Sequence, residues 1–248
     1  MIMKLNIKNG SLWHGDCLEL MRDIPSGSID MILCDLPYGT TQNKWDTVIP
    51  FEPLWIEYWR IAKHNTPIVL TAAQPFTSAL VMSQINYFKY DWVWDKCNPT
   101  GFGNAKKQPL RYHESVLVFY KYQCVYNPIK WVGKVNNKQG SKNTKLYSEN
   151  YNGGFKRGED DNSGMKYPKS IFQFQKHSSQ SKLHPTQKPV ALFEYLIKTY
   201  TNPGDKVLDN CIGSGTTAVA CENTDRKWIG IEKNMDYFLA SWERINSL

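Results

Sequence analysis

Short apolar runs rich in β-branched residues alternate along the chain with longer stretches whose apolar residues follow a helical spacing. The apolar runs are Ile29–Cys34, Ile68–Thr71, Tyr90–Trp94, Ser115–Tyr120, Lys206–Leu208 and Trp228–Glu232. The stretches with helical spacing are Phe51–Lys63, Phe76–Gln84, Val190–Tyr200, Thr216–Cys221 and Met235–Ile245. Runs that are apolar at nearly every position suit strands buried on both faces of a sheet. The alternation predicts an α/β fold with a mostly parallel sheet covered by helices on both sides.

The pattern is lost between residues 121 and 183, where Asn, Gly, Ser, Lys and Tyr dominate and turn signals are frequent. This segment holds 12 Lys and Arg residues against 4 Asp and Glu residues, a net charge of +8, whereas the whole chain carries +7. The basic excess is therefore confined to one segment, which suits a polyanionic partner. We predict a main domain of residues 1–120 and 184–248, interrupted by an inserted region of residues 121–183.

Composition excludes several classes of protein. With 248 residues, of which 41% are hydrophobic, the chain can bury one substantial core. No apolar run approaches the roughly 20 residues that cross a bilayer, and the first residues lack a signal-peptide pattern. The six cysteines lie far apart without a CxxC pair, which argues against a zinc site and a disulfide framework. We expect a cytoplasmic protein with reduced thiols, no metal and no membrane partner.

A glycine-rich turn between a predicted strand and a predicted helix carries the first chemical signal. Gly213, Gly215 and Ala218 match G-x-G-x-x-A, which lets a ligand approach the backbone at a helix start. Glu232 ends the next predicted strand, where a carboxylate can accept both hydroxyls of a ribose. Asp209, just before the glycines, would repel a pyrophosphate but suits the positive methionine end of S-adenosylmethionine. The segment therefore favours an S-adenosylmethionine site over a nicotinamide dehydrogenase.

A second turn, Asp35–Tyr38, directly follows the strand predicted at Ile29–Cys34. The exocyclic amine of an aminopurine is a poor nucleophile because its lone pair is delocalised into the ring. Acceptors facing its two N–H groups favour the geometry needed for in-line attack on a sulfonium methyl. Asp35 would be one acceptor and the Leu36 carbonyl the other, while Tyr38 would stack on an extruded base. Taken alone, the turn is also compatible with an ordinary strand ending.

Together these motifs resemble those of the DNA amino-methyltransferases, which modify adenine N6 or cytosine N4. The D/N/S-P-P-Y/F/W catalytic motif of that family appears as Asp35–Tyr38, and its F-x-G-x-G cofactor motif as Cys211–Gly215. The order, with the catalytic motif first, is similar to the β-type circular permutation. The resemblance implies a Rossmann-like, S-adenosylmethionine-dependent methyltransferase sheet, circularly permuted, with residues 121–183 as an inserted target-recognition region.

The resemblance also implies further site residues. Gly15–Cys17 resembles an N-terminal element whose Asp, here Asp16, contacts the cofactor adenine. His184–Pro189 is similar to a motif that implies a role for Lys188 and its neighbours in seating the methionine end. The predicted cofactor-binding residues are thus Asp16, Lys188, Asp209, Gly213, Gly215, Thr216, Thr217 and Glu232. The predicted catalytic residues are Asp35, Leu36, Pro37 and Tyr38.

The chain departs from the family pattern at two positions. Leu36 replaces the usual first proline, which keeps the carbonyl acceptor but reduces backbone rigidity, and Cys211 stands where Phe is frequent. Asp46, although close to the catalytic turn, is not expected to act as a general base, because the amine can lose its proton after methyl transfer.

The acidic start of the catalytic motif favours adenine N6 in double-stranded DNA as the acceptor. N4-cytosine methylation by the same scaffold, and a catalytically silent nucleic-acid-binding module, remain as alternatives. Methylation of RNA or of a protein glutamine is also conceivable, although the basic insert favours a nucleic acid. A homodimer and a cognate restriction endonuclease are partners that the resemblance allows.

Overall fold

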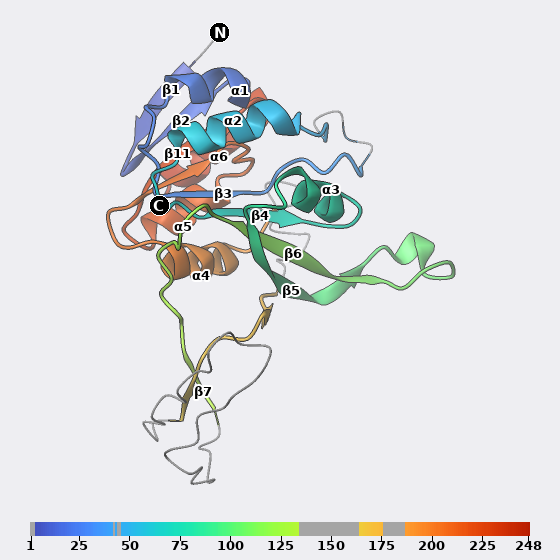
Figure 1. Cartoon of the computed structure of the whole chain (residues 1–248). Coiled ribbons are helices and arrows are strands. Elements are labelled where there is room, and N and C mark those ends of the chain that lie inside the picture. The colour runs from blue at the N-terminus through green and yellow to red at the C-terminus, as the bar shows by residue number, and fades with distance from the viewer. Residues whose placement is uncertain (1–2, 42, 44–45, 134–163, 176–186) are drawn as a thin grey trace. The chain divides into compact units, whose positions relative to one another are not determined.

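The computed structural model describes residues 3–41, 43, 46–133, 164–175 and 187–248 (Figure 1). The chain divides into two compact units, one of residues Met1–Asn127 and Ser170–Leu248 and the other of residues Pro128–Lys169. Both ends of the predicted insert thus belong to the larger unit. His184 and most of the predicted insert lie outside the described residues. Target recognition by residues 121–183 stays a prediction.

The larger unit is built on a nine-stranded sheet. In spatial order its strands are β1 (Met3–Ile7), β2 (Gly10–His14), β11 (Lys227–Glu232), β10 (Lys206–Asp209), β3 (Met31–Cys34), β4 (Ile68–Ala72), β6 (Arg111–Phe119), β5 (Phe88–Thr100) and β9 (Ile171–Gln173). The five strands from β2 to β4 run parallel, and β1 and β6 pair antiparallel at either side of them. The α/β fold with a mostly parallel sheet is therefore confirmed.

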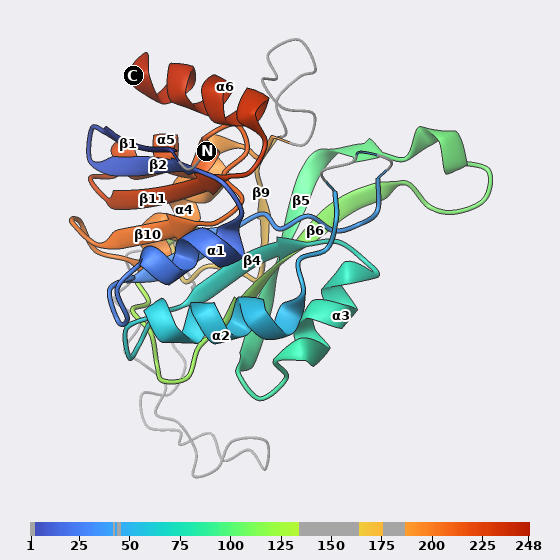
Figure 2. The same cartoon turned by 90° about the horizontal axis from the view of Figure 1, so that it is seen from above.

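Helices cover both faces of this sheet (Figure 2). One face carries α4 (Val190–Tyr200), α5 (Thr216–Glu222) and α6 (Met235–Asn246), and the other carries α1 (Cys17–Leu20), the 3₁₀ turn η1 (Met21–Asp23), α2 (Phe51–Ile61) and α3 (Phe76–Ser83). Successive side chains of a strand point to opposite faces. In β3, Met31 and Leu33 pack with the α4–α6 layer, whereas Ile32 and Cys34 pack with the α1–α3 layer. Burial of both sets explains why this strand is apolar at every position.

The parallel strands divide at β10 and β3, which pair directly with each other. From β10 the chain passes through α5 to β11 on one side, and from β3 it passes through α2 to β4 on the other. Ligands of such sheets bind at the carboxyl ends of the strands where the order reverses. The fold therefore places Asp209, which ends β10, beside Asp35, which follows β3.

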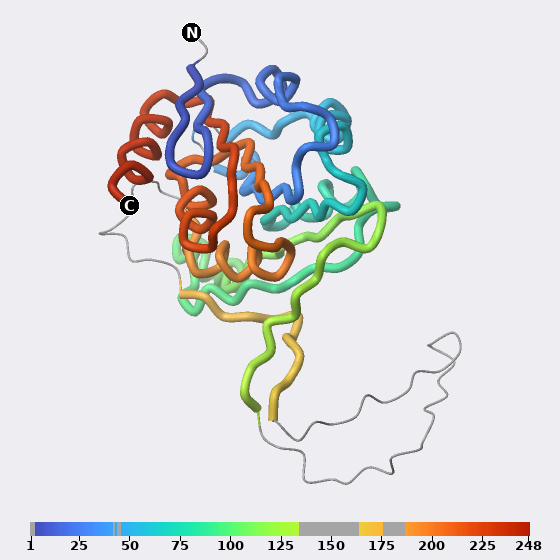
Figure 3. The backbone as a smooth tube through the Cα atoms, turned by 90° about the vertical axis from the view of Figure 1, so that its left-hand side faces the viewer, coloured from blue at the N-terminus to red at the C-terminus, as the bar shows by residue number. Residues whose placement is uncertain are grey.

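Two edge features were not predicted. The hairpin of β1 and β2 joins the sheet through β2, which pairs parallel with β11, so this N-terminal hairpin lies beside a strand from the C-terminal part of the chain (Figure 3). At the other edge, β5 and β6 extend past the sheet as a two-stranded ribbon that ends in the short 3₁₀ turn η2 (Phe102–Asn104; Figure 1). The residues of this ribbon are mostly polar and form no apolar run, which is why the predicted strands were too short here.

The smaller unit is described only at its two ends. There β7 (Trp131–Val132) pairs antiparallel with β8 (Met165–Lys166), and the Trp131 indole donates a hydrogen bond to the Tyr167 carbonyl.

Three features are absent from the part of the chain that the structure describes. All six cysteines fall within it, and all are free thiols. No helix there is long and apolar enough to cross a membrane. No group of three metal-ligating side chains occurs in the same residues.

Candidate active site

A cavity of about 770 Å³ opens at the carboxyl ends of the central strands. Ten of the twelve predicted site residues line it, namely Asp16, Asp35, Leu36, Pro37, Tyr38, Lys188, Asp209, Gly213, Thr216 and Glu232. The volume is in the usual range of small-molecule sites. Residues far apart in the sequence thus converge on one cavity, which carries carboxylates on both the predicted cofactor side and the predicted catalytic side.

Gly215 and Thr217 do not line the cavity. Gly215 has a φ of +79°, and a Cβ at this position would lie 3.3 Å from side-chain atoms of Ser241 and Ile245. The glycine therefore allows α5 to begin tightly against α6. Thr217 is buried and donates a hydrogen bond to the Asp209 carboxylate. The structure places both residues behind the cavity wall, where they support residues that do line it.

Asp209 is held in place by its own turn. Besides the Thr217 hydroxyl, the backbone N–H of Cys211 donates to Asp209 Oδ1 at 3.0 Å. Burial raises the pKa of this carboxyl to about 6, against the hydrogen bonds that favour its charged form. A buried carboxylate with hydrogen-bond donors on one side and the cavity on the other provides a site for a positive charge.

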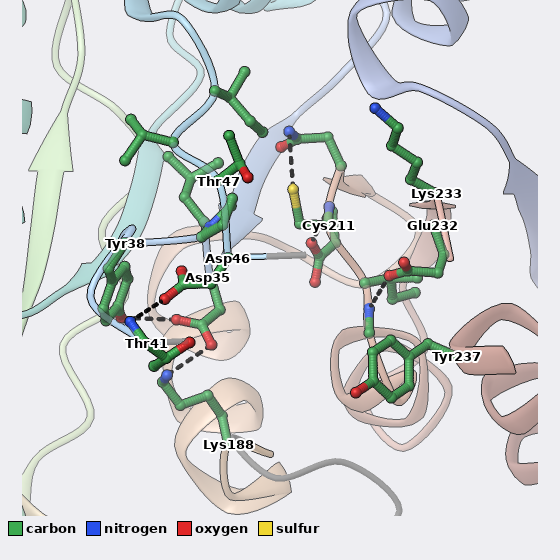
Figure 4. Close-up of a pocket in the computed structure, with 18 of the residues that line it drawn as sticks. Asp35, Tyr38, Thr41, Asp46, Thr47, Lys188, Cys211, Glu232, Lys233 and Tyr237 are labelled. Carbon is green, nitrogen blue, oxygen red and sulfur yellow. Dashed lines mark hydrogen bonds and ion pairs between the residues drawn. The ribbon is translucent and has the colours of Figure 1, made fainter. Parts of the chain in front are cut away.

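Glu232, at the end of β11, accepts two backbone hydrogen bonds. Gly213 N donates to Oε2 at 2.9 Å (Figure 4), and Asn234 N donates to Oε1 at 2.7 Å. Burial raises the pKa of Glu232 despite these bonds. A carboxylate oxygen can accept more than one hydrogen bond. Each oxygen of Glu232 thus keeps acceptor capacity toward the cavity, as a pair of ribose hydroxyls requires.

Asp16 caps the N-terminus of α1. Its Oδ1 accepts from Leu18 N at 2.9 Å, and its Oδ2 accepts from Lys233 Nζ at 3.0 Å. Burial acts to raise the pKa of Asp16, but the hydrogen bonds from Lys233 and Leu18 prevail and lower it. The carboxylate therefore stays charged at the cavity wall.

On the catalytic side, two hydroxyls hold one oxygen of Asp35. Tyr38 donates to Oδ1 at 2.8 Å, and Thr71 of β4 donates to the same atom. The Tyr38 ring stacks on Phe76, with 5.1 Å between ring centroids. Burial and the nearby Asp35 and Glu114 carboxylates hold the pKa of the Tyr38 hydroxyl well above its usual value, so this hydroxyl remains a donor.

A lysine distant in sequence occupies the other oxygen of Asp35. Lys188 Nζ donates to Oδ2 at 2.7 Å (Figure 4). The same Nζ atom lies 3.3 Å from Glu114 Oε2. Burial acts to lower the pKa of Lys188, but the two carboxylates prevail and raise it, so the side chain is an ammonium ion. Sequence analysis associated Lys188 with the cofactor, whereas the structure places its ammonium against the predicted catalytic carboxylate.

Sequence analysis did not identify Glu114, Lys96 or Thr71 as site residues. Glu114 lies in β6 and Lys96 in β5, and Lys96 Nζ lies 3.5 Å from Glu114 Oε1. Both side chains are largely buried and line the cavity. For Lys96 the only sequence signal is a charged residue beside the apolar part of a strand, which is too common to indicate a site. Glu114 ends the segment Arg111–Glu114, which resembles the family pattern, but that resemblance assigns it no role.

Asp46 anchors the loop that follows Tyr38. Its carboxylate accepts the backbone N–H groups of Gly39, Thr40 and Thr41 at 2.8, 2.9 and 2.7 Å. Burial acts to raise its pKa, but the hydrogen bonds from Thr41 and the neighbouring backbone lower it. These contacts give Asp46 a structural role in shaping the catalytic turn.

This set of groups fits S-adenosylmethionine. Asp16 and Glu232 can accept hydrogen bonds from an adenosyl group, and Asp209 can face a positively charged methionine end. Gly213, with a φ of +53°, lines the cavity where its backbone can approach a ligand. When bound, S-adenosylmethionine supplies a methyl group activated by a positively charged sulfur.

Comparison with known proteins agrees with this arrangement. The sequence model of the DNA methylase family N6_N4_Mtase matches residues 29–243. The Type II methyltransferase M.HpaI of Haemophilus parainfluenzae is 26% identical over 94% of this chain and 73% of its own length. The Type II methyltransferase M1.MboII of Moraxella bovis is 26% identical over 90% of this chain and 91% of its own length.

Solved structures agree with this result. The crystal structure of the M1.HpyAVI–SAM complex has a TM-score of 0.64 and 25% identity, covering 95% of this chain and 98% of that one. The cytosine-N4-specific PvuII DNA methyltransferase shares the fold with a TM-score of 0.66 at 20% identity, covering 98% of this chain and 88% of that one. The chain therefore belongs to the β-type N6/N4 DNA methylase family and is an S-adenosylmethionine-dependent DNA methyltransferase.

Proposed function

We propose that this enzyme methylates the N6 amine of an adenine that is flipped out of double-stranded DNA at a specific sequence. The observation that carries the proposal is Asp35, a carboxylate at the carboxyl end of β3 that lines the cavity. A carboxylate accepts hydrogen bonds from an amine more strongly than a hydroxyl does. A motif that begins with Asp therefore suits the poorly nucleophilic adenine amine.

The backbone after Asp35 supplies the second acceptor in this proposal. Leu36 replaces the usual proline, but its side chain is buried in the apolar cluster that includes α2 and α3. Pro37 follows and restricts the backbone further. Burial of the Leu36 side chain holds its carbonyl in place and offsets the rigidity that a proline would give.

Tyr38 provides the surface for the extruded base. Its ring is half-buried, lines the cavity and rests on Phe76. A base stacked on Tyr38 can present its amine to Asp35, because the Tyr38 hydroxyl and the Asp35 carboxylate are already in contact. Flipping the base brings the amine to a cavity that a stacked duplex base could not reach.

Charge supports DNA as the substrate. Residues 97–113, which include the ribbon tip, contain no Asp or Glu but hold Lys106, Lys107 and Arg111. Arg111 and His113 line the cavity at the base of the ribbon. We assign phosphate contacts to this ribbon and target recognition to the basic region 121–183. The Type II methyltransferase names of the relatives support a place in a restriction–modification system.

The test is the identity of the methylated nucleoside. Purified protein is incubated with isotopically labelled S-adenosylmethionine and unmodified bacterial DNA, and labelled nucleosides are identified by mass spectrometry. We expect N6-methyladenine with the wild type and none with Asp35→Ala. Labelled N4-methylcytosine alone would replace adenine by cytosine as the target. Cofactor binding without label in DNA would instead favour a silent binding module, or RNA or protein as the acceptor.

A further inference from the structure

Four charged side chains form a buried cluster on the catalytic side of the cavity. Asp35 follows β3, Glu114 lies in β6, Lys96 in β5, and Lys188 precedes α4. The exposed fraction of the side chain is 3% for Lys96, 7% for Lys188, 12% for Glu114 and 23% for Asp35. Two ammonium groups thus balance two carboxylates, and each ammonium lies within ion-pair distance of Glu114.

In this arrangement both oxygens of Asp35 already accept hydrogen bonds, so a target amine competes with Lys188 for Oδ2. Its Oδ1 accepts from Tyr38 and Thr71, and its Oδ2 accepts from Lys188 at 2.7 Å. The Lys188 ammonium also lies over the Tyr38 ring, 5.5 Å from the ring centroid. A base that stacks on Tyr38 and offers its amine to Asp35 therefore meets Lys188 at both contacts.

Lys188 also opposes the charge that the reaction creates. The amine gains positive charge as the new N–C bond forms, and it becomes neutral again only when a proton leaves. A second cation on Asp35 would repel that charge in a site of low dielectric constant. Lys188 must therefore leave Asp35 before the amine reacts.

Glu114 provides the place to which Lys188 can move. Glu114 Oε2 is buried, makes no hydrogen bond and lies 3.3 Å from Lys188 Nζ. Buried carboxylate oxygens are normally hydrogen-bonded, so this one has unused acceptor capacity directed at the ammonium. A short movement of one side chain would satisfy Glu114 and free Asp35 Oδ2.

We propose that Lys188 is a placeholder for the target amine and that Glu114 is a positioning residue that receives it. Without a base in the site, the ammonium neutralises Asp35. When the amine arrives, the ammonium transfers to Glu114 and the amine takes its place on Asp35. The inference rests on the proposed role of Asp35 but holds for an adenine or a cytosine amine alike.

The test is a double-mutant cycle read by methyl transfer into DNA at saturating cofactor. Glu114→Gln keeps the size of the side chain but removes its charge, so Lys188 stays on Asp35. We expect kcat to fall about 30-fold, within the range that coupled pairs show, with cofactor affinity unchanged. Glu57→Gln, which removes the same charge from the Glu57–Arg60 ion pair on α2, is the matched control and should leave kcat unchanged.

Rescue distinguishes positioning from a merely structural role. If Glu114 acts only by drawing Lys188 away, it has no function once Lys188 is removed. The kcat of the double variant Lys188→Met, Glu114→Gln should then equal that of Lys188→Met alone. The double variant should then be faster than Glu114→Gln alone. Wild-type kcat for Glu114→Gln, or single effects that multiply in the double variant, would overturn the proposal.

A structure of the unmutated enzyme with DNA and a cofactor analogue that cannot donate its methyl group gives a test that needs no variant. We expect Lys188 Nζ to lie nearer to Glu114 than to Asp35, with the target amine on Asp35. An amine on Asp35 while Lys188 still occupies Oδ2 would contradict the placeholder alone. Full methyl transfer by Asp35→Ala would instead contradict the role proposed for Asp35.

Discussion

Asp209, Glu232 and Asp35 each lie at the end of a parallel strand and line one cavity, yet their charges are balanced in different ways. Asp209 and Glu232 are held by hydroxyl and backbone N–H groups within 19 residues of themselves. Asp35 is held in addition by a lysine 153 residues away. Fixed local donors suit a site for a cofactor that binds the same way in every cycle. A movable cation suits a site that a DNA base must enter and leave.

The largest effect is expected from removing the carboxylate of Asp35. Asp35→Ala should lower the single-turnover rate of methyl transfer by about 10³-fold, because the amine loses the acceptor that aligns it. Chemical quench of labelled DNA measures this rate. A loss of less than about tenfold would mean that Asp35 supports the turn and does not bind the amine.

The loop that follows the catalytic turn should give the next largest effect. Asp46→Ala leaves the N–H groups of Gly39, Thr40 and Thr41 without their acceptor. We expect a loss of about 2 kcal/mol in unfolding free energy and a loss of activity of about tenfold or more. Denaturant titration and steady-state kinetics measure the two quantities. Unchanged activity would show that the turn keeps its shape without this anchor.

On the cofactor side, we predict that the affinity for S-adenosylmethionine depends on pH. Because burial raises the pKa of Asp209 to about 6, its negative charge is lost as the pH falls through 6. Affinity for the positively charged cofactor should therefore be about tenfold weaker at pH 5 than at pH 7, as measured by calorimetry. Asp209→Asn should bind weakly at both pH values. An identical pH dependence in the wild type and in Asp209→Asn would exclude Asp209 as its source.

The raised pKa of Asp209 also makes the free energy of unfolding depend on pH. In the unfolded chain the carboxyl group of Asp209 has its ordinary pKa of 3.8, whereas in the folded protein its pKa is about 6. The folded state therefore binds the proton more tightly, so the contribution of Asp209 to stability falls as the pH rises from about 4 to about 6. Asp209→Asn should remove this contribution. Denaturant unfolding of both proteins at pH 4.5 and pH 7 measures the difference.

The smallest effect is expected at the ribbon tip. Changing both Lys106 and Lys107 to Gln should weaken DNA binding a few-fold near physiological salt and reduce the slope of log K against log salt by about 2. Cofactor affinity should not change. A salt slope equal to that of the wild type would remove the ribbon from the DNA interface.

The sequence predicted the central layers well because their signals are local. The helix predicted at Val190–Tyr200 has those bounds in the structure. Strand β3 lies within its predicted apolar run, and β10 extends one residue beyond its run, to Asp209. The turns at Asp35 and Gly213 could also be predicted, because the residues of each motif are adjacent in the sequence. Their convergence on one cavity follows from the strand order, which the family resemblance implied.

The rest depends on contacts that no local pattern encodes. The pairing of Lys188 with Asp35 and Glu114 joins three segments that are far apart in the sequence, and no local pattern around any of the three residues indicates this contact. The N-terminal hairpin escaped prediction because its turn places Lys8 at a φ of +50°, where Gly or Asn is the usual signal. Tertiary pairing with β11 holds that turn in place.

The central claim is that Asp35 serves the DNA base while Asp209 serves the cofactor. It is tested most directly by measuring cofactor binding by calorimetry and single-turnover methyl transfer by quench for Asp35→Asn and Asp209→Asn side by side. We predict that Asp35→Asn binds S-adenosylmethionine within about twofold of the wild type but transfers its methyl group about 10³-fold more slowly. We predict that Asp209→Asn binds the cofactor about tenfold more weakly. Equal losses of cofactor affinity in the two variants would contradict this division of roles.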